Sequence, residues 1–133
     1  MSRNRADPVP CDRKYKSSHE WVKVDGDVAT VGITDHAQAA LGEIVFADLP
    51  EVGREVTAAE GTAAVESVKA AADIYSPIAG EIVKINAKLE DTPDLINKKP
   101  HDEGWMFQLK IADPSELDGL LDSTAYAATL EDK

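Results

Sequence analysis

Residues 64–77 have the sequence AVESVKAAADIYSP, and this stretch determines the fold that we expect. Both of its arms can form β-strands, and Lys69 and Ala70 lie between them. The bulky side chains of Val65 and Ile74 lie away from this midpoint, and the residues close to it are small. The sequence therefore predicts a β-hairpin with Lys69 at its tip, where no neighbour covers the lysine or forms an ion pair with it.

Short β-rich runs separated by turn residues surround this hairpin and predict a mainly β chain. Residues 21–33 have the pattern of a second hairpin that turns at Asp25-Gly26, and residues 34–41 that of a short helix ended by Gly42. Polar residues 88–104 predict a loop. Further strands are expected over 43–49, 62–68, 72–75, 81–87 and 105–111, and C-terminal helices over 116–121 and 123–128.

A short internal repeat adds to this picture, because Gly42-Glu43-Ile44-Val45 recurs as Gly80-Glu81-Ile82-Val83. Each copy opens a predicted strand, and the Lys69 hairpin lies between the two copies. This arrangement predicts two small pseudo-symmetric sheets packed face to face, with the hairpin at one end. Gly80 is expected to permit a bend or a close approach of two strands.

The size and charge of the chain limit its function. It has 133 residues, which fits one domain, and a net charge of −11. This acidity argues against nucleic acid and anionic membranes as partners, and it suits proteins with basic surface patches. The one cysteine, Cys11, excludes a disulfide framework.

The N-terminus has no apolar signal core, and we expect a cytoplasmic protein. We interpret residues 1–13 as a flexible lead-in and residues 14–133 as the folded domain, with its C-terminal helical segment.

A lysine at a turn is common and needs no function, but the sequence around Lys69 is unusual. The run from Glu66 to Glu81 closely resembles the lipoylation site of the glycine cleavage system H protein family. Three more motifs resemble those of the family, in the same order and at matching spacing. They are Ser18 to Val22, then Gly32 to Gln38 with Leu41 to Val45, and finally Leu95 to Asn97 with Gly104-Trp105.

Departures from the family pattern are small. His101-Asp102 stand where the family often has Tyr-Gly, and Ala72 stands where a serine is frequent. Neither change falls on Lys69, although His101-Asp102 could alter a contact with a partner.

The resemblance implies a mainly β barrel-sandwich hybrid, as in lipoyl domains, with lipoate attached to Lys69 through an amide. It implies a carrier that is not an enzyme. The carrier shuttles an aminomethyl group from the pyridoxal-phosphate glycine decarboxylase (P protein) to the tetrahydrofolate-dependent aminomethyltransferase (T protein). Dihydrolipoyl dehydrogenase (L protein) then reoxidises the dithiol. From bond lengths, the arm reaches roughly 14 Å beyond the backbone.

The resemblance also implies roles for residues near the lysine. Ser18, Glu20 and Asp73 match the family positions that shelter the amine of the loaded arm in a surface cleft. Without the family, these side chains would be solvated surface groups. A lipoate ligase or an octanoyl or lipoyl transferase is expected to recognise the segment around the lysine, which comprises Glu66, Ser67, Val68 and Ala70. A simple solvated strand residue is the other interpretation of Glu66.

Other carriers fit less well. Biotinyl lysines usually lie between methionines, but Val68 and Ala70 flank Lys69 here. Lipoyl domains of 2-oxoacid dehydrogenases typically have an acid before the lysine and lack the His-Glu-Trp motif. A lipoyl relay, which passes its lipoyl group to 2-oxoacid dehydrogenases, remains open on sequence alone.

Catalysis is poorly supported by the sequence. The histidines His19, His36 and His101 are scattered, and no metal-binding motif or phosphate-binding loop is present.

Overall fold

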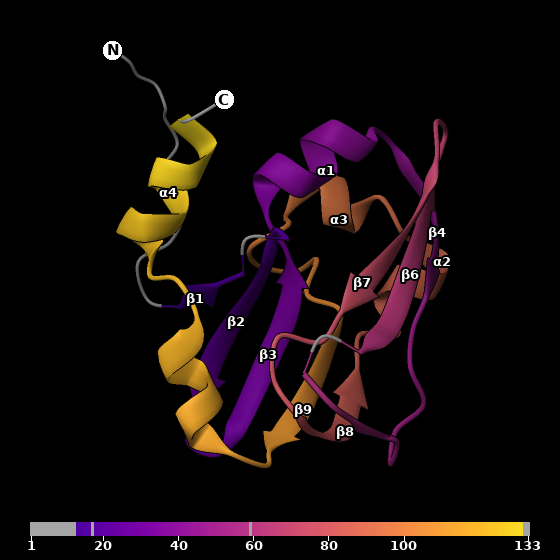
Figure 1. Cartoon of the computed structure of the whole chain (residues 1–133). Coiled ribbons are helices and arrows are strands. Elements are labelled where there is room, and N and C mark those ends of the chain that lie inside the picture. The colour runs from indigo at the N-terminus through magenta and orange to yellow at the C-terminus, as the bar shows by residue number, and fades with distance from the viewer. Residues whose placement is uncertain (1–12, 17, 59, 132–133) are drawn as a thin grey trace.

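The computed structural model describes residues 13–16, 18–58 and 60–131, and within them the chain forms two antiparallel β-sheets flanked by short helices (Figure 1). The larger sheet has the order β1-β2-β3-β9-β8-β5, and the smaller has the order β4-β6-β7. The strands are β1 (Lys14–Tyr15), β2 (Glu20–Asp25), β3 (Val28–Ile33), β4 (Ile44–Asp48), β5 (Glu55–Val56), β6 (Gly61–Ser67), β7 (Ala71–Tyr75), β8 (Gly80–Ile85) and β9 (Phe107–Ile111). The predicted mainly β fold with two sheets is confirmed.

The two copies of the short repeat fall in different sheets, since β4 belongs to the smaller sheet and β8 to the larger. The sheets are unequal, with three and six strands in the described residues. Gly42 ends a helix with φ 85°, whereas Gly80 lies within β8. The same four-residue sequence therefore lies at the end of a helix in one copy and at the start of a strand in the other.

The described residues also contain five short helical segments: α1 (Asp35–Leu41), α2 (Lys88–Asp91), α3 (Leu95–Lys98), a 3₁₀ helix (Pro114–Gly119) and α4 (Ser123–Glu131). The hydroxyl of Thr34 caps α1 by accepting a hydrogen bond from Ala37 N. The Gly26 turn between β2 and β3 has φ 67°, the positive value that a two-residue hairpin loop needs at that position.

Some of the predicted elements differ from the structure. Residues 88–104 are not all loop, because α2 and α3 lie within them. The segment predicted as a helix over 116–121 is a 3₁₀ helix that begins at Pro114. The two-residue strands β1 and β5 have no counterpart in the sequence prediction. These are the shortest elements, for which periodicity carries little signal.

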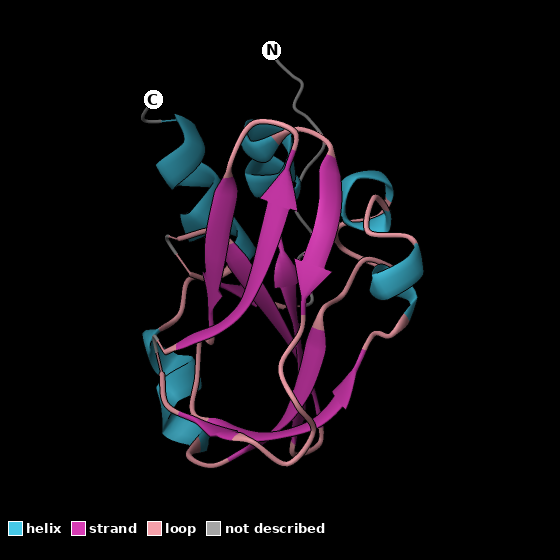
Figure 2. Cartoon of the chain, turned by 90° about the vertical axis from the view of Figure 1, so that its right-hand side faces the viewer, coloured by secondary structure: helices cyan, strands magenta, loops and turns pink. Residues whose placement is uncertain are grey.

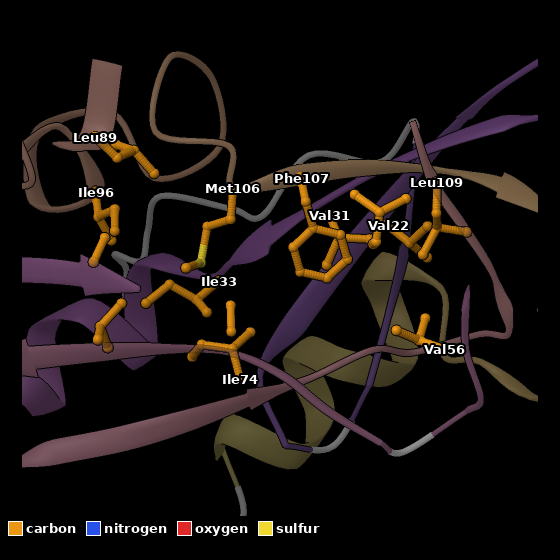
Figure 3. Packing of buried hydrophobic residues seen from close by; sticks show 14 of the residues in the cluster. Val22, Val31, Ile33, Val56, Ile74, Leu89, Ile96, Met106, Phe107 and Leu109 are labelled. Carbon is orange, nitrogen blue, oxygen red and sulfur yellow. The ribbon is translucent and has the colours of Figure 1, made fainter. Parts of the chain in front are cut away.

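The main core fills the space between the two sheets, which lie one behind the other in Figure 2. Its side chains are mostly Val, Ile, Leu and Ala, as the low aromatic content requires. Figure 3 shows Leu89 and Ile96 at one end of this core beside Met106, and Val56 with Leu109 at the other. The buried Leu89 anchors α2 to the core, and the buried Ile96 together with the partly buried Leu95 anchors α3.

A second cluster holds the C-terminal helix against the first strands. Tyr126 of α4 stacks on Tyr15 of β1, with ring centroids 4.8 Å apart, and Trp21 is buried in the same cluster. The Tyr126 hydroxyl also bonds to His19 Nδ1 and to the Thr34 hydroxyl, both at 2.7 Å. His19 has a positive φ of 76°, and these bonds help to hold the turn that leads into β2.

Within the described ranges, no helix combines the length and apolar character needed to cross a membrane. The same part of the chain contains no group of three or more His, Cys, Asp or Glu side chains that could hold a metal ion. Apart from Arg13, the predicted lead-in over residues 1–13 lies outside the described residues.

Candidate functional site: the lysine hairpin

The hairpin formed by β6 and β7 projects beyond the smaller sheet next to the end of α1 (Figure 1). Its last strand pair is Glu66 with Ala71, so the turn consists of residues 67–70 with Lys69 near its apex. The Ser67 hydroxyl oxygen accepts hydrogen bonds from Lys69 N at 3.1 Å and Ala70 N at 3.0 Å. A serine that bonds to backbone groups two and three residues ahead stabilises a tight turn.

The tip is also tied to the segment that joins α1 to β4. Val68 N donates to the carbonyl oxygen of Glu43 at 3.0 Å. A Cβ built on Gly42 would come within 3.2 Å of Lys69 Cε, so the stem of the lysine lies against this glycine. The lysine therefore does not stand as fully alone as its small sequence neighbours suggest. Its partner in this contact comes from another segment.

The lysine side chain is otherwise exposed, and it forms no ion pair or hydrogen bond within the described part of the chain. An amine in this position is open to an acylating enzyme and has no partner to lose when its charge is removed. The backbone below it is held by the bonds to Ser67 and Glu43. These residues fit a covalently attached acyl arm, because the base of the arm would be fixed and its far end free.

Glu20 and Ser18 are brought together by the structure. The Ser18 hydroxyl donates a hydrogen bond to Glu20 Oε1, and Tyr75 N donates to Oε2 at 3.3 Å. Glu20 is only 2% exposed. Burial raises the pKa of this carboxyl above its ordinary value, against the lowering effects of the bonds from Ser18 and Tyr75. A cation beside this buried carboxyl would stabilise its ionised form.

Asp73 lies on the outer, exposed face of β7, in register with Ala64 of β6 and, beyond it, Asp48 of β4. It lines a hollow of about 590 Å³ that also includes Arg54. Neither Ser18 nor Glu20 lines this hollow. The three residues predicted to form one cleft thus divide into a bonded pair and a separate surface carboxylate two residues along β7 from Tyr75.

Three of the four predicted recognition residues are exposed around the lysine, since Glu66, Val68 and Ala70 all face solvent, and Val68 is 65% exposed. Ser67 is partly buried beneath the turn. The sequence prediction did not include Phe46, which is 53% exposed and pairs directly with Glu66 across the sheet. Phe46 lies inside an apolar run, so the sequence does not indicate that its side chain faces solvent. A β-bulge between Ile44 and Phe46 determines the direction of this side chain.

The sequence prediction also assigned no role to Asn97, although this residue lies in one of the family motifs. Its side chain bonds to the segment on which the hairpin tip rests, and nothing in the local sequence of α3 indicates a partner more than 50 residues away.

Two packed β-sheets that present an exposed lysine at a hairpin tip define a class of small carrier domains, in which the protein positions a prosthetic group and the group supplies the chemistry. The glycine cleavage H-protein family model matches residues 13–133. The chain therefore belongs to the glycine cleavage H-protein family.

Individual relatives agree with this assignment. The chain is 58% identical to the glycine cleavage system H protein of Serratia proteamaculans over 125 residues, which cover 93% of this chain and 98% of that protein. It is 56% identical to the H protein of Teredinibacter turnerae, with 93% and 96% covered. The crystal structure of an H protein from Mycobacterium marinum matches with a TM-score of 0.85 and 36% identity, over 92% of this chain and 99% of that chain.

Membership carries several consequences for the chain. It is the lipoyl carrier of the glycine cleavage system and not an enzyme. Members of the family carry a covalently attached lipoyl-lysine, and the P, T and L proteins are the other components of the system. The two-sheet architecture is the lipoyl-domain-like hybrid fold that the resemblance implied.

Proposed function

We propose that Lys69 is the residue that bears the lipoyl group and that the β6–β7 hairpin presents it to each enzyme of the system in turn. The observation that carries this proposal is the exposed lysine amine, without an ion pair in the described residues, at the tip of a turn whose backbone is bonded to Ser67 and Glu43. Once attached, the lipoyl group supplies a dithiolane that accepts and releases a small amine-bearing carbon unit.

The chain's own part is to hold the base of the arm and to receive its far end. Strand β7 from Ala71 to Tyr75 spans roughly 14 Å at the usual rise per residue, and Lys69 lies two residues before its first residue, so the arm must fold back along the whole strand to bring its end toward Tyr75. Because Tyr75 N is bonded to Glu20, that carboxylate lies at the end of β7 remote from the lysine. In this proposal the arm lies back along β7, so that an ammonium group at its end approaches Glu20 and Ser18.

In this proposal Glu20 binds the ammonium group directly, and the Ser18 hydroxyl keeps the carboxylate in place. The burial that raises the pKa of Glu20 also excludes water from one side of the pair. Asp73 contributes a second negative charge along the same strand, from the exposed face.

We further propose that the lipoate-attaching enzyme recognises Glu66, Val68 and Ala70 on the outside of the hairpin, while Ser67 acts from within by shaping the turn. This enzyme must reach the lysine nitrogen itself, whereas the P, T and L proteins meet the far end of the arm. Changes beside the lysine are therefore expected to affect its modification first. We place the protein in the cytoplasm of a bacterial cell, as suits its bacterial relatives.

A reconstituted assay tests the proposal. Lipoylated wild-type protein is expected to support release of CO₂ from glycine by a purified P protein, and Lys69→Arg protein treated in the same way is expected to give none. Circular dichroism and thermal unfolding of the variant serve as the control for folding. Activity of the folded arginine variant at the wild-type level would overturn the assignment of Lys69.

A further inference from the structure

Asn97 of α3 forms three hydrogen bonds from one side chain. Its Nδ2 donates to the carbonyl oxygen of Gly42 and to Oε1 of Gln38, and its Oδ1 accepts from Ile44 N, all at 2.8 Å. The partners lie 53 to 59 residues away in the sequence. A half-buried amide with three of its four bonds made is well satisfied and has one preferred orientation.

These bonds hold the two sides of Glu43. Gly42 precedes it and accepts from Asn97, while Ile44 follows it and donates to Asn97. Gly42 is also the C-terminal cap of α1 and has a positive φ of 85°, so the chain turns sharply at this point. The Asn97 side chain thus bridges the turn from α1 into β4 and fixes the peptide groups around Glu43.

Two contacts of the hairpin tip with the rest of the described chain fall on this segment. Val68 N donates to Glu43 O at 3.0 Å, and the stem of Lys69 lies against Gly42, where a Cβ would come within 3.2 Å of Cε. A side chain that fixes Gly42 to Ile44 therefore also fixes the surface on which the tip rests. Two successive hydrogen-bonded contacts therefore connect Asn97 to the tip. The first joins its side chain to the Gly42–Ile44 segment, and the second joins Glu43 O of that segment to Val68 N, next to Lys69.

We propose that Asn97 is a positioning residue for the modified lysine, which acts by holding the Gly42–Ile44 segment and, through it, the direction in which the hairpin tip presents Lys69. The inference rests on the proposed role of Lys69. Without the amide, the tip would sample several directions, and only a fraction of them would suit the lipoate-attaching enzyme. The apparent Michaelis constant for the carrier rises in inverse proportion to that fraction.

Asn86 provides a matched control. Its Nδ2 donates to Glu103 O at 2.7 Å and to Trp105 O at 2.8 Å, so it also braces a loop through its amide. It is 5% exposed and lies in the turn after β8, and none of its hydrogen bonds reaches the hairpin. Replacing either asparagine by alanine removes bonds of the same kind, but only one replacement loosens the support of the tip.

The experiment uses the full-length unmodified chain with a purified lipoate ligase, lipoate and ATP. Initial rates of lipoyl transfer are measured against carrier concentration for wild type, Asn97→Ala and Asn86→Ala, and the exchange of the Val68 amide hydrogen is followed by NMR. We expect Asn97→Ala to raise KM about ten-fold, with kcat within about two-fold, as for a tip that is correctly placed about one tenth of the time. The Val68 amide should exchange faster in Asn97→Ala alone.

Equal effects of the two substitutions on KM, or unchanged Val68 exchange in Asn97→Ala, would overturn the inference. If Asn97→Ala does not fold, Asn97→Asp carries the same two measurements, because it keeps the volume of the side chain and loses both donated bonds. Failure of the wild-type protein to accept lipoate at all would contradict the proposed function of Lys69 instead. In that event the Val68 exchange rates still decide whether Asn97 supports the tip.

Discussion

The hydroxyl oxygen of Ser67 accepts a hydrogen bond from the backbone N–H of Lys69, 3.1 Å away. The same oxygen accepts from Ala70 N and its hydroxyl donates to Ala70 O at 3.1 Å, so one small side chain closes the turn. Ser67 thus stabilises the turn through its own hydrogen bonds. This role requires no contact between the Ser67 side chain and a partner protein.

Replacement of Ser67 by alanine is expected to remove these bonds and to lower the free energy of unfolding by about 1 kcal/mol, as for a partly exposed hydrogen-bonding group. Because the turn becomes looser, lipoylation should slow as well. Ser67→Thr keeps an oxygen at the same place and should retain most of the rate. Urea unfolding and initial rates of lipoyl transfer check this, and a threonine variant as slow as the alanine variant would contradict the role of the hydroxyl.

Glu20 gives a prediction about pH. Burial raises its folded-state pKa above the ordinary value of 4.5, so over a range above this value the folded protein binds this proton more tightly than the unfolded chain. The contribution of Glu20 to stability is therefore largest below pH 4.5 and is lost as the pH rises through the folded pKa. Glutamine cannot ionise and does not suffer this loss.

The Tm of Glu20→Gln relative to wild type should therefore increase with pH from about 4.5 upward and level off once Glu20 is ionised in the folded protein. Thermal unfolding between pH 4 and pH 8 measures the difference. Glu81→Gln, at an exposed position in β8, is the comparison for the loss of one carboxylate charge. A Tm difference for Glu20→Gln that falls with pH would show that the native state favours the charged carboxylate.

Gly80 allows β8 and β9 to approach closely. A Cβ on this residue would lie 2.2 Å from the backbone oxygen of Lys110, which cannot rotate away. Gly80→Ala is therefore expected to lower the free energy of unfolding by about 3 kcal/mol. Gly61→Ala is the control, since its nearest atom would be Tyr75 Cε1 at 3.9 Å, and it should change stability by less than about 1 kcal/mol. Chemical denaturation of both variants measures this, and equal effects would mean that the strands can shift apart.

Much of the fold could be predicted from local sequence. The β-rich arms on either side of Lys69 predict the hairpin that the structure contains. The end of the β-rich pattern at Thr34, with a glycine at position 42, predicts α1. The close approach at Gly80 was also expected. By contrast, α2 and α3 are four residues long, have no side-chain cap bond and depend on Leu89 and Ile96 reaching the core, which only the assembled fold reveals.

The site was less accessible to sequence reasoning. A motif placed Glu20 near the hairpin, but its bond to Tyr75 N joins residues 55 positions apart and depends on how the two sheets pack. The same holds for Asn97 and Ile44, which are 53 positions apart. Patterns along the chain identify elements and turns, whereas these contacts depend on the distance between elements.

The separation of Asp73 from the Ser18–Glu20 pair leads to a further prediction. Glu20→Ala should speed the loss of amine from the loaded carrier to water about ten-fold, because it removes the buried carboxylate. Asp73→Ala should have a smaller effect, since its charge is exposed and screened. Ammonia release after loading measures both rates. Asp48→Ala, in the same row of the sheet, is the control and should match wild type. A larger effect of Asp73→Ala than of Glu20→Ala would contradict the proposed role of the pair.

The identity of the modified residue is tested most directly by mass. The protein is produced with lipoate available, its intact mass is measured, and the peptide that covers residues 65–75 is analysed for the attached group. We expect one lipoyl group per chain, located on Lys69, and none on Lys69→Arg protein that unfolds like wild type. Lys84→Arg, a change at an exposed strand lysine, should be modified normally. A lipoyl group on another residue, or a lipoylated Lys69→Arg chain, would contradict the account.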